Sequence, residues 1–305
     1  MERGWEKHIL FLRFDKMNQA EQYNWIETVS FSHPGLVRRE NEDSFMDVGQ
    51  DGCYIVSDGM GGGSDGEIAS QIVVETISDS IEGTASDSPG SRKYAVQQAV
   101  HRANRTIREY SQAHNYAQMG ATLVLLLLDP WHSGKALLCH VGDSRIYRFR
   151  NGTLQQLTLD HTVGVELALS LAKKGAKQDG ALMMDHTNSP LSHVLTRSIG
   201  VSENVLPEWD ETTIEPNDLF LLCSDGVTTM LKDDEIQRIF LENPTTEAKV
   251  TTLSQRVLEA GARDNFTMIL CQVAASLPAP MIPDEEELQE SNYLLKIAEE
   301  RIDRA

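Results

Sequence analysis

The sequence predicts an α+β fold in which antiparallel β-sheets pack face to face, with helices on their outer faces. Strand-like segments occur in groups, and pairs of amphipathic helical segments separate the groups, so the order lacks the regular alternation of a βαβ fold. Asn151-Gly152, between two short apolar runs, is a strong signal for a β-hairpin. The chain has no internal repeat that would indicate a solenoid or a propeller.

Strands are predicted where short apolar or alternating runs are bounded by turn residues. Residues 25–31 alternate apolar and polar side chains, as a half-buried strand does, and His33-Pro34-Gly35 ends this run. The remaining predicted strands lie at 53–56, 121–128, 136–141, 146–149, 154–157, 205–214, 219–223 and 266–273.

Helices are predicted where apolar residues recur at helical spacing. The first predicted pair covers 66–81 and about 92–113, with a loop rich in Ser, Gly and Asp between them. The second pair covers 232–241 and about 246–260. A further helical stretch at 165–174 begins a segment rich in Gly, Lys and Asp, which we interpret as a mobile insertion rather than part of the core.

The composition excludes several classes of function. The chain has 305 residues, enough for a substantial core, and its 27 Lys and Arg against 46 Asp and Glu give a net charge of −19. Such a field repels nucleic acids and anionic membranes. The apolar runs at 8–14 and 123–128 are too short for a signal peptide or a membrane span. We therefore expect a cytoplasmic protein without nucleic-acid or membrane partners.

The cysteines do not form a recognisable metal or redox motif. All of them lie in or beside apolar runs, none forms a Cys-x-x-Cys pair, and no histidine lies at zinc-site spacing from them. They are Cys53, Cys139, Cys223 and Cys271. We expect buried, reduced thiols.

Five short acidic clusters are the main candidates for chemistry, and we expect each of them to follow directly after a strand. They are Asn41-Glu42-Asp43, Asp58-Gly59-Met60-Gly61-Gly62, Gly142-Asp143-Ser144-Arg145, Ser224-Asp225-Gly226 and Arg263-Asp264-Asn265. Carboxylates at strand ends need partners, and several that converge on one point would form a site for hard divalent cations, which prefer oxygen ligands.

Each cluster also has a simpler interpretation. Asp58-Gly59 could be an ordinary strand–turn–helix junction, in which Asp58 bonds to the local backbone. Asp225 follows a nearly all-apolar run and Asp264 precedes another, where a carboxylate is costly unless it is paired or bound to a metal. Three such carboxylates make a shared metal site the more economical account. Arg38 could form a structural ion pair or could bind a phosphate with two hydrogen bonds.

Six segments stand in the same order as a known set of motifs: Gly35–Phe45, Ser57–Gly62, Met119–Thr122, Val141–Tyr147, Leu222–Val227 and Arg263–Thr267. Together they resemble the metal-dependent protein phosphatases of the PPM (protein phosphatase 2C-like) family, particularly its bacterial branch. The resemblance covers roughly residues 24–274. It leaves residues 1–23 as an N-terminal accessory segment and 275–305 as an acidic C-terminal tail.

The resemblance implies a four-layer α-β-β-α sandwich with a flap subdomain at about 163–193. It also implies two core ions, Mn²⁺ or Mg²⁺, bridged by Asp58. Asp225 and Asp264 would complete the protein ligands of the first ion. The Gly59 carbonyl would bind the second ion, with Glu42 acting through its waters.

Three further residues acquire implied roles from the same resemblance. Asp43 would orient metal-bound water, Asp143 together with Asp225 would hold a possible third ion, and Arg38 would bind the substrate phosphate. The implied reaction is direct attack of a metal-bridging hydroxide on the phosphorus of phosphoserine or phosphothreonine, without a covalent phosphoenzyme.

The chain departs from the family pattern at one chemically relevant position. Bacterial relatives commonly carry a histidine where this chain has Gly63, so the leaving group would be protonated by metal-bound water or by another acid. His161 is a candidate acid only because it matches a recurrent family segment, and we favour a capping or turn role for it. Ala121 and Ala262 replace a common Thr and Gly, which we expect to be tolerated.

The predicted function is a metal-dependent serine/threonine protein phosphatase that acts as a monomer on phosphorylated products of protein kinases. One alternative is a catalytically weak binding module of the same fold, but such a module should have lost its metal carboxylates, and Asp58, Asp225 and Asp264 are present. A two-metal nuclease is the other alternative, and the lack of a basic stripe argues against it.

Overall fold

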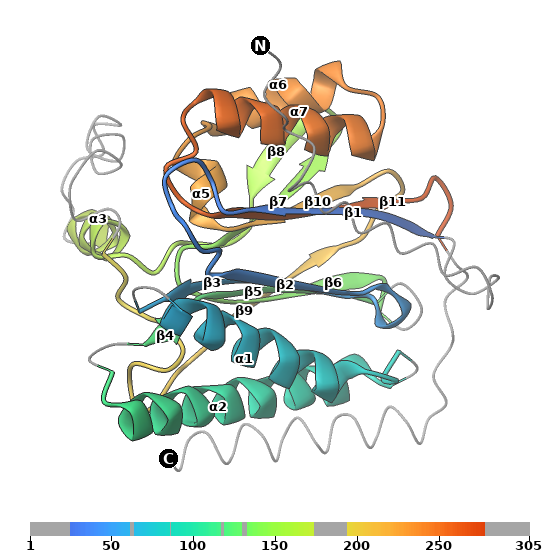
Figure 1. Ribbon diagram of the computed structural model, residues 1–305. Coiled ribbons are helices and arrows are strands. Elements are labelled where there is room, and N and C mark those ends of the chain that lie inside the picture. Colours follow the sequence, from blue (N-terminus) through green and yellow to red (C-terminus); the bar gives the residue numbers. More distant parts are fainter. Residues whose placement is uncertain are drawn as a thin grey trace.

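The computed structural model describes residues 25–61, 64–85, 87–116, 119–129, 133–173 and 194–277. Two antiparallel sheets lie face to face, and a pair of helices covers the outer face of each sheet (Figure 1). The predicted four-layer α-β-β-α sandwich is therefore confirmed.

The first sheet has the strand order β1-β11-β10-β7-β8. These strands are β1 (Ile26–His33), β7 (Arg145–Arg150), β8 (Thr153–Gln156), β10 (Leu219–Cys223) and β11 (Phe266–Val273). The second sheet has the order β2-β3-β5-β6-β9, and β4 pairs with β3. Its strands are β2 (Asp43–Val48), β3 (Cys53–Met60), β4 (Gly120–Ala121), β5 (Leu123–Asp129), β6 (Lys135–Val141) and β9 (Glu208–Thr213).

Four long helices form the outer layers. α1 (Ser64–Ile81) and α2 (Pro89–His114) cover the second sheet, and α6 (Asp233–Glu242) and α7 (Thr246–Glu259) cover the first (Figure 1). The other helical elements of the described residues are η1 (Gly49–Asp51), α3 (Val163–Lys173) and the single turn α5 (Asp225–Thr228).

The central strands are buried on both faces, which explains why nearly all of their residues are apolar. In β5, Leu123, Leu125 and Leu127 belong to the core beneath α1 and α2. The alternate residues Val124, Leu126 and Leu128 belong to the core between the two sheets. A third core lies between the first sheet and the helices α6 and α7. Strand ends in the middle layers therefore emerge at the rim of the sandwich, where polar side chains can gather.

Several predicted elements match the structure closely, and others differ for local reasons. Asn151 and Gly152 both have positive φ, 51° and 80°, as the predicted hairpin turn between β7 and β8 requires. The helix α2 begins at Pro89 rather than near 92, because the Ser88 side chain caps it by accepting a hydrogen bond from Ser91 N. The apolar run 121–128 is divided at Thr122 into β4 and β5.

Three elements were not predicted, namely β2, α5 and the short η1, and one begins later than expected. The strand β2 was missed because Ser44 and Asp47 interrupt its apolar pattern, and the turn α5 is too short to show helical periodicity. The strand β9 begins at Glu208 rather than at 205.

The cysteine prediction is confirmed, since all four cysteines are buried and unpaired in strands. No helix of the described residues is long and apolar enough to cross a membrane. Predictions about the N-terminal segment, most of the flap and the acidic tail fall on 1–24, 174–193 and 278–305, which lie outside the described residues, as does Gly63.

Candidate metal centre

The predicted acidic residues come together at one rim of the sandwich. Asp43 is the first residue of β2 and lies directly opposite Asp58 of β3 in the antiparallel register. Asp225 opens α5, immediately after β10. Burial and then the negative charges of Asp43, Asp225, Asp143 and Asp264 raise the pKa of Asp58 well above its ordinary value. Asp58 therefore stands at the centre of the cluster.

One sequence expectation about these clusters is wrong. The Asn41–Asp43 cluster lies at the start of β2, and the Arg263–Asn265 cluster directly precedes β11, so neither follows directly after a strand. Both sheets are antiparallel, so strand beginnings and strand ends alternate along the same rim. Clusters before and after strands can therefore meet at one place.

Hydrogen bonds between the sheets hold Asp43 in this position. The Ser224 hydroxyl donates to Asp43 Oδ2 at 2.7 Å and accepts from Thr267 N at 3.0 Å. Burial raises the pKa of Asp43 to about 7, and Asp225 and Asp264 add to the shift, whereas the hydroxyls of Ser224 and Thr267 oppose it.

The glycines of two motifs permit close approach of backbone segments. A Cβ on Gly226 would lie 1.9 Å from the Asn265 carbonyl oxygen, and a Cβ on Gly59 would lie 1.9 Å from the Gly66 carbonyl oxygen. The Asp-Gly pairs therefore bring the carboxylates of Asp225 and Asp58 next to the loop and the helix that complete the site.

Asn265 organises the loop that carries Glu42. Its amide donates to the carbonyls of Pro34 and Glu40, at 3.0 and 2.8 Å, and its Oδ1 accepts from Glu42 N at 2.9 Å. Sequence reasoning placed Asn265 in a motif without a role, because these partners are more than 200 positions away in the chain.

Two oxygens in the cluster have no partner among the described residues. Glu42 Oε1 and Asp43 Oδ1 are buried without a hydrogen bond. A buried acceptor without a donor is costly, and a divalent cation would remove that cost. The pKa of Glu42 is raised above its ordinary value, because burial outweighs the opposing effect of the positive charge on Arg38. The donor set consists of oxygens alone, which fits Mn²⁺ or Mg²⁺.

The Asp143 turn adjoins the same centre. Burial and then the charges of Asp225 and Asp160 raise the pKa of Asp143 to about 7. Thr122 connects this turn to Asp58, since its Oγ1 lies 2.7 Å from Ser144 Oγ and accepts from Asp58 N at 2.9 Å. Sequence reasoning assigned Thr122 no role.

Arg38 lies at the exposed side of the cluster. Its Nη2 donates to Asp264 Oδ2 at 2.8 Å, and both side chains are roughly half exposed, at 49% and 40%. This bond to Asp264 is the main cause of the raised pKa of Arg38. The structural ion pair that the sequence left open is thus present, and it places the guanidinium at the solvent edge of the carboxylates.

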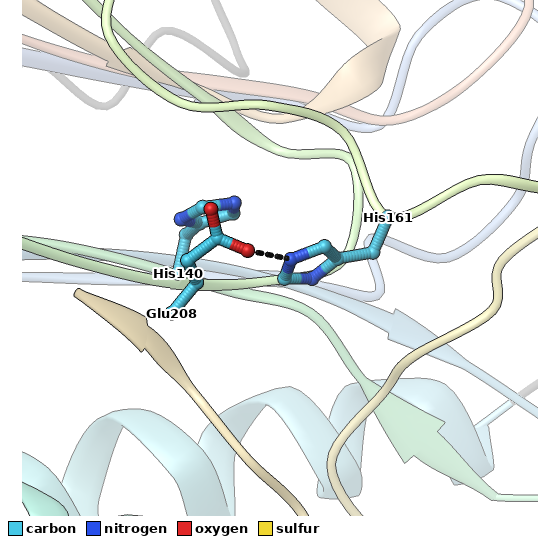
Figure 2. Close-up of side chains that lie close together, drawn as sticks. All are labelled: His140, His161 and Glu208. Carbon is cyan, nitrogen blue, oxygen red and sulfur yellow. Dashed lines mark hydrogen bonds and ion pairs between the residues drawn. The ribbon is translucent and has the colours of Figure 1, made fainter. Parts of the chain in front are cut away.

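The His161 ring contacts Gly142 and Glu208 rather than the aspartates of the carboxylate centre. The ring is buried, its Nδ1 lies 3.1 Å from Gly142 N, and its Nε2 lies 3.1 Å from Glu208 Oε2 (Figure 2). The candidate role as a proton donor to the leaving group thus has no support in these contacts. His140 and Glu208, which lie beside it, were not identified from the sequence.

Comparison with known proteins agrees with this geometry. The family model described as protein phosphatase 2C matches residues 37–270. The serine/threonine phosphatase Stp of Listeria monocytogenes is 30% identical over 243 residues, covering 78% of this chain and 92% of the relative. The protein phosphatase PhpP of Streptococcus pneumoniae is 31% identical over 218 residues, covering 71% and 83%.

Solved structures give the same result. PppA, described as a regulatory component of the type VI secretion system in Pseudomonas aeruginosa, superposes with a TM-score of 0.70 at 30% identity over 82% of this chain and 99% of its own. The catalytic domain of the phosphatase PstP, solved with two manganese ions, gives a TM-score of 0.67 at 27% identity over 82% and 99%. The chain belongs to the protein phosphatase 2C family of metal-dependent serine/threonine protein phosphatases.

Proposed function

We propose that this chain removes phosphate from phosphoserine and phosphothreonine in proteins, and that the carboxylates around Asp58 hold the Mn²⁺ or Mg²⁺ ions on which this activity depends. The observation that supports the proposal most directly is the convergence of four aspartates on Asp58 beside two buried carboxylate oxygens without partners. We assign the catalytic domain to residues 24–274 and the flap to about 163–193.

The core ions would be held by the residues nearest to Asp58. Asp58 would bridge both ions, Asp225 and Asp264 would complete the first, and the Gly59 carbonyl with Glu42 would serve the second. Asp143 would hold a third ion with Asp225. When bound, the ions make a nucleophile available near neutral pH and offset charge on the phosphoryl oxygens.

The chain's own residues would orient the reactants. Asp43, fixed by Ser224, has one buried oxygen without a hydrogen-bond partner among the described residues, which suits it to hold a water molecule in place. Arg38, at the exposed edge, would bind the substrate phosphate through its guanidinium.

A covalent cysteine mechanism is disfavoured by burial. Cys139 and Arg145 do have the Cys-x5-Arg spacing of cysteine-dependent phosphatases. However, burial raises the pKa of the Cys139 thiol, and the Arg145 guanidinium is bound to Asp160 at 2.7 Å. The thiol is therefore protonated and has no anion-binding arginine beside it.

Hydrolysis of a phosphothreonine peptide tests the proposal. We expect activity that requires Mn²⁺ or Mg²⁺, is abolished by EDTA, and falls by about 100-fold or more in Asp225→Asn. Asp234→Asn is a matched control, because the Asp234 side chain is 75% exposed on α6. Activity that is insensitive to EDTA, or equal in wild type and Asp225→Asn, would overturn the metal assignment. Activity on phosphotyrosine alone would overturn the substrate assignment.

The cellular context follows from the relatives and the charge. We propose that the substrates are proteins phosphorylated by serine/threonine kinases, since the relatives are named serine/threonine phosphatases. A monomeric cytoplasmic enzyme is consistent with the net charge of −19, which disfavours self-association and binding to anionic lipid.

A further inference from the structure

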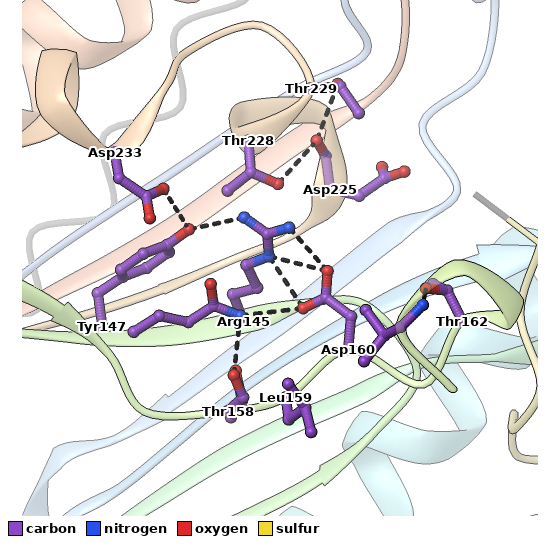
Figure 3. A network of polar contacts seen from close by, with 12 residues as sticks. Arg145, Tyr147, Thr158, Leu159, Asp160, Thr162, Asp225, Thr228, Thr229 and Asp233 are labelled. Atoms are coloured by element: carbon purple, nitrogen blue, oxygen red, sulfur yellow. Dashed lines mark hydrogen bonds and ion pairs between the residues drawn. The ribbon is translucent and has the colours of Figure 1, made fainter. Parts of the chain in front are cut away.

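A short segment, Thr158–Thr162, lies along the turn that carries Asp143. At one end of the turn, Ile146 N donates to Thr158 Oγ1 at 3.1 Å. In the middle, the Arg145 guanidinium makes a bidentate contact with Asp160, with distances of 2.7 to 3.1 Å (Figure 3). The segment therefore holds the turn through side chains along its length.

At the other end of the turn, His161 and Gly142 form a reciprocal pair. The His161 backbone N donates to the Gly142 carbonyl at 2.9 Å, and Gly142 N donates to His161 Nδ1 at 3.1 Å. Gly142 has a φ of 104°, and a Cβ there would lie 2.6 Å from Thr122 Cγ2. The residue before Asp143 is thus held between His161 and Thr122 and has little freedom to shift.

The bond from Gly142 fixes the protonation of the His161 ring. Because Gly142 N–H is a donor, Nδ1 must carry a lone pair, so the ring is neutral with its proton on Nε2. That Nε2–H donates to Glu208 Oε2 at 3.1 Å. Arg197 Nη1 lies 3.3 Å from the same nitrogen, but it cannot donate to Nε2 while Nε2 carries the proton, so its charge acts on Glu208 instead. Glu208 in turn lies 3.6 Å from Arg197 Nη1. The hydrogen bonds therefore run in one direction, from Gly142 N through the His161 ring to the Glu208 carboxylate.

This protonation state argues against a metal ion among His140, His161 and Glu208, although their ligand atoms lie within 4.8 Å of one another. A metal at His161 Nε2 would require the proton to move to Nδ1, where it would oppose Gly142 N–H. The two imidazole rings are also stacked at 4.5 Å with only 16° between their planes, so their in-plane lone pairs cannot converge on one ion. His140 Nε2 also lies 2.9 Å from the Leu159 carbonyl oxygen and donates to it.

His161 also lies where the two ends of the flap meet. Thr196 N donates to the His161 carbonyl at 2.9 Å, and Val163 N donates to the Val194 carbonyl at 2.9 Å. A β-bridge joins Thr162 and Leu195. The backbone of His161 is thus attached to the base of the flap, and its ring to the Asp143 turn.

We propose that His161 is a positioning residue: its Nδ1 fixes Gly142, and through Gly142 it orients the Asp143 carboxylate relative to the base of the flap. The contact between His161 Nε2–H and Glu208 keeps the ring in the tautomer that this task requires. The part of this inference that concerns an ion rests on the proposed role of Asp143.

Two substitutions at position 161 separate the functions of the two ring nitrogens. Asparagine places its side-chain oxygen near the position of Nδ1, so His161→Asn can still accept from Gly142 N. Glutamine places its amide near the position of Nε2, so His161→Gln retains a partner for Glu208 and loses the bond to Gly142. His140→Gln is a control, since it retains a donor near Nε2 for the Leu159 carbonyl.

The first measurement uses the full chain without metal. Hydrogen exchange of the Gly142 amide, followed by NMR, should accelerate by tenfold or more in His161→Gln and by no more than about threefold in His161→Asn and His140→Gln. The ¹⁵N shifts of wild-type His161 should show a proton on Nε2. Equal exchange in the Asn and Gln variants, or a proton on Nδ1, would overturn the proposal.

The second measurement is Mn²⁺ titration by calorimetry. His161→Gln should weaken the weakest Mn²⁺ binding step by about tenfold and leave the tighter steps unchanged, as Asp143→Asn should. If Asp143→Asn leaves every step unchanged, the proposed role of Asp143 fails, while the exchange of Gly142 still tests His161. If His161→Gln weakens all steps equally, its role is general stability and the positioning proposal is overturned.

Discussion

The two ends of the β7–β10 strand pair hold buried carboxylates in opposite ways. At one end, the Asp218 side chain is fully buried, and it accepts two hydrogen bonds of 2.6 Å from Arg150 and one of 2.8 Å from Glu215 N. At the other end, Asp225 joins a cluster in which Glu42 Oε1 and Asp43 Oδ1 have no partner among the described residues.

The presence or absence of a cationic partner distinguishes the structural carboxylate of Asp218 from the proposed metal ligands around Asp58. Asp218 has a guanidinium of this chain as its counter-charge, so its cost of burial is offset within the fold. The aspartates around Asp58 instead raise one another's pKa, as like charges do. A chain that folds with several mutually repelling carboxylates at one end of a strand pair is arranged to receive cations there.

The largest expected effect comes from replacing the central ligand. Asp58→Asn should lower Mn²⁺-dependent kcat by on the order of 10³-fold, because the proposed bridging charge is lost. The metal-free variant should unfold at the same or a higher temperature than wild type, since one of several mutually repelling carboxylates is removed. Steady-state kinetics and thermal unfolding in EDTA measure the two quantities. A metal-free variant that is strongly destabilised would show that Asp58 is a structural carboxylate.

The second experiment changes Asp218, whose charge is paired with Arg150. Asp218→Asn should destabilise the fold by roughly 3 kcal/mol, because the partly buried Arg150 loses the fully buried one of its two carboxylate partners, Asp218 and Glu215. The kcat of the folded fraction should remain unchanged. Denaturant unfolding with kinetics at low temperature provides the measurement, and Asp210→Asn on the exposed face of β9 is the control. A tenfold loss of kcat would show that the two ends are coupled.

The next effect concerns pH and metal together. The pKa of Asp43 and that of Asp143 are raised to about 7 in the folded chain, so the folded state binds protons more tightly than the unfolded state. The contribution of these two carboxyl groups to metal-free stability should therefore be complete below about pH 4 and should be lost as pH rises from there to about 7. Saturating Mn²⁺ at about 100 times its Kd should restore about 2.7 kcal/mol at neutral pH and less at pH 5.

Differential scanning fluorimetry with and without Mn²⁺, from pH 5 to pH 8, measures this dependence. Metal-free stability that rises over that interval would contradict the raised pKa values. The metal-free stability of the Asp58→Asn variant should depend less on pH, which would show that the dependence arises from the carboxylates around Asp58.

The smallest expected effect is at the exposed edge. Arg38→Ala should lower kcat/KM by about tenfold, mostly through KM, and should weaken inhibition by inorganic phosphate. Arg38→Lys should retain the charge and recover only part of the loss, because lysine cannot make the bidentate contact. An unchanged KM would indicate that Arg38 serves only its ion pair with Asp264.

The sequence was informative where the chemistry is local. Runs such as Leu219–Cys223 and Phe266–Val273 are buried on both faces, so their strands could be placed within a residue or two. Asp58 and Asp225 could be selected because each stands beside a glycine at the end of such a run. The glycines permit a backbone approach that no other residue allows, since an added Cβ would lie 1.9 Å from a carbonyl oxygen, and this requirement is visible in the sequence as an Asp-Gly pair.

The parts that could not be predicted depend on register between distant strands. Glu208 reaches His161 only because β9 pairs with β6 and places Glu208 opposite His140, and nothing near Glu208 in the sequence indicates this. The same holds for Asn265, whose partners lie at the other end of the chain. A role for His161 in the Asp143 turn required knowing which nitrogen faces Gly142.

The pairing of Asp43 with Asp58 across β2 and β3 has a consequence for the life of the protein in the cell. If divalent ions offset the repulsion between these two strands, the fraction of unfolded molecules depends on the concentration of free ion. Proteases remove unfolded chains, so stability differences of 1–2 kcal/mol change steady-state amounts several-fold. Starvation for manganese or magnesium would then reduce the quantity of the phosphatase as well as its turnover, and the phosphorylation of its substrates would respond to ion supply over the time of protein degradation.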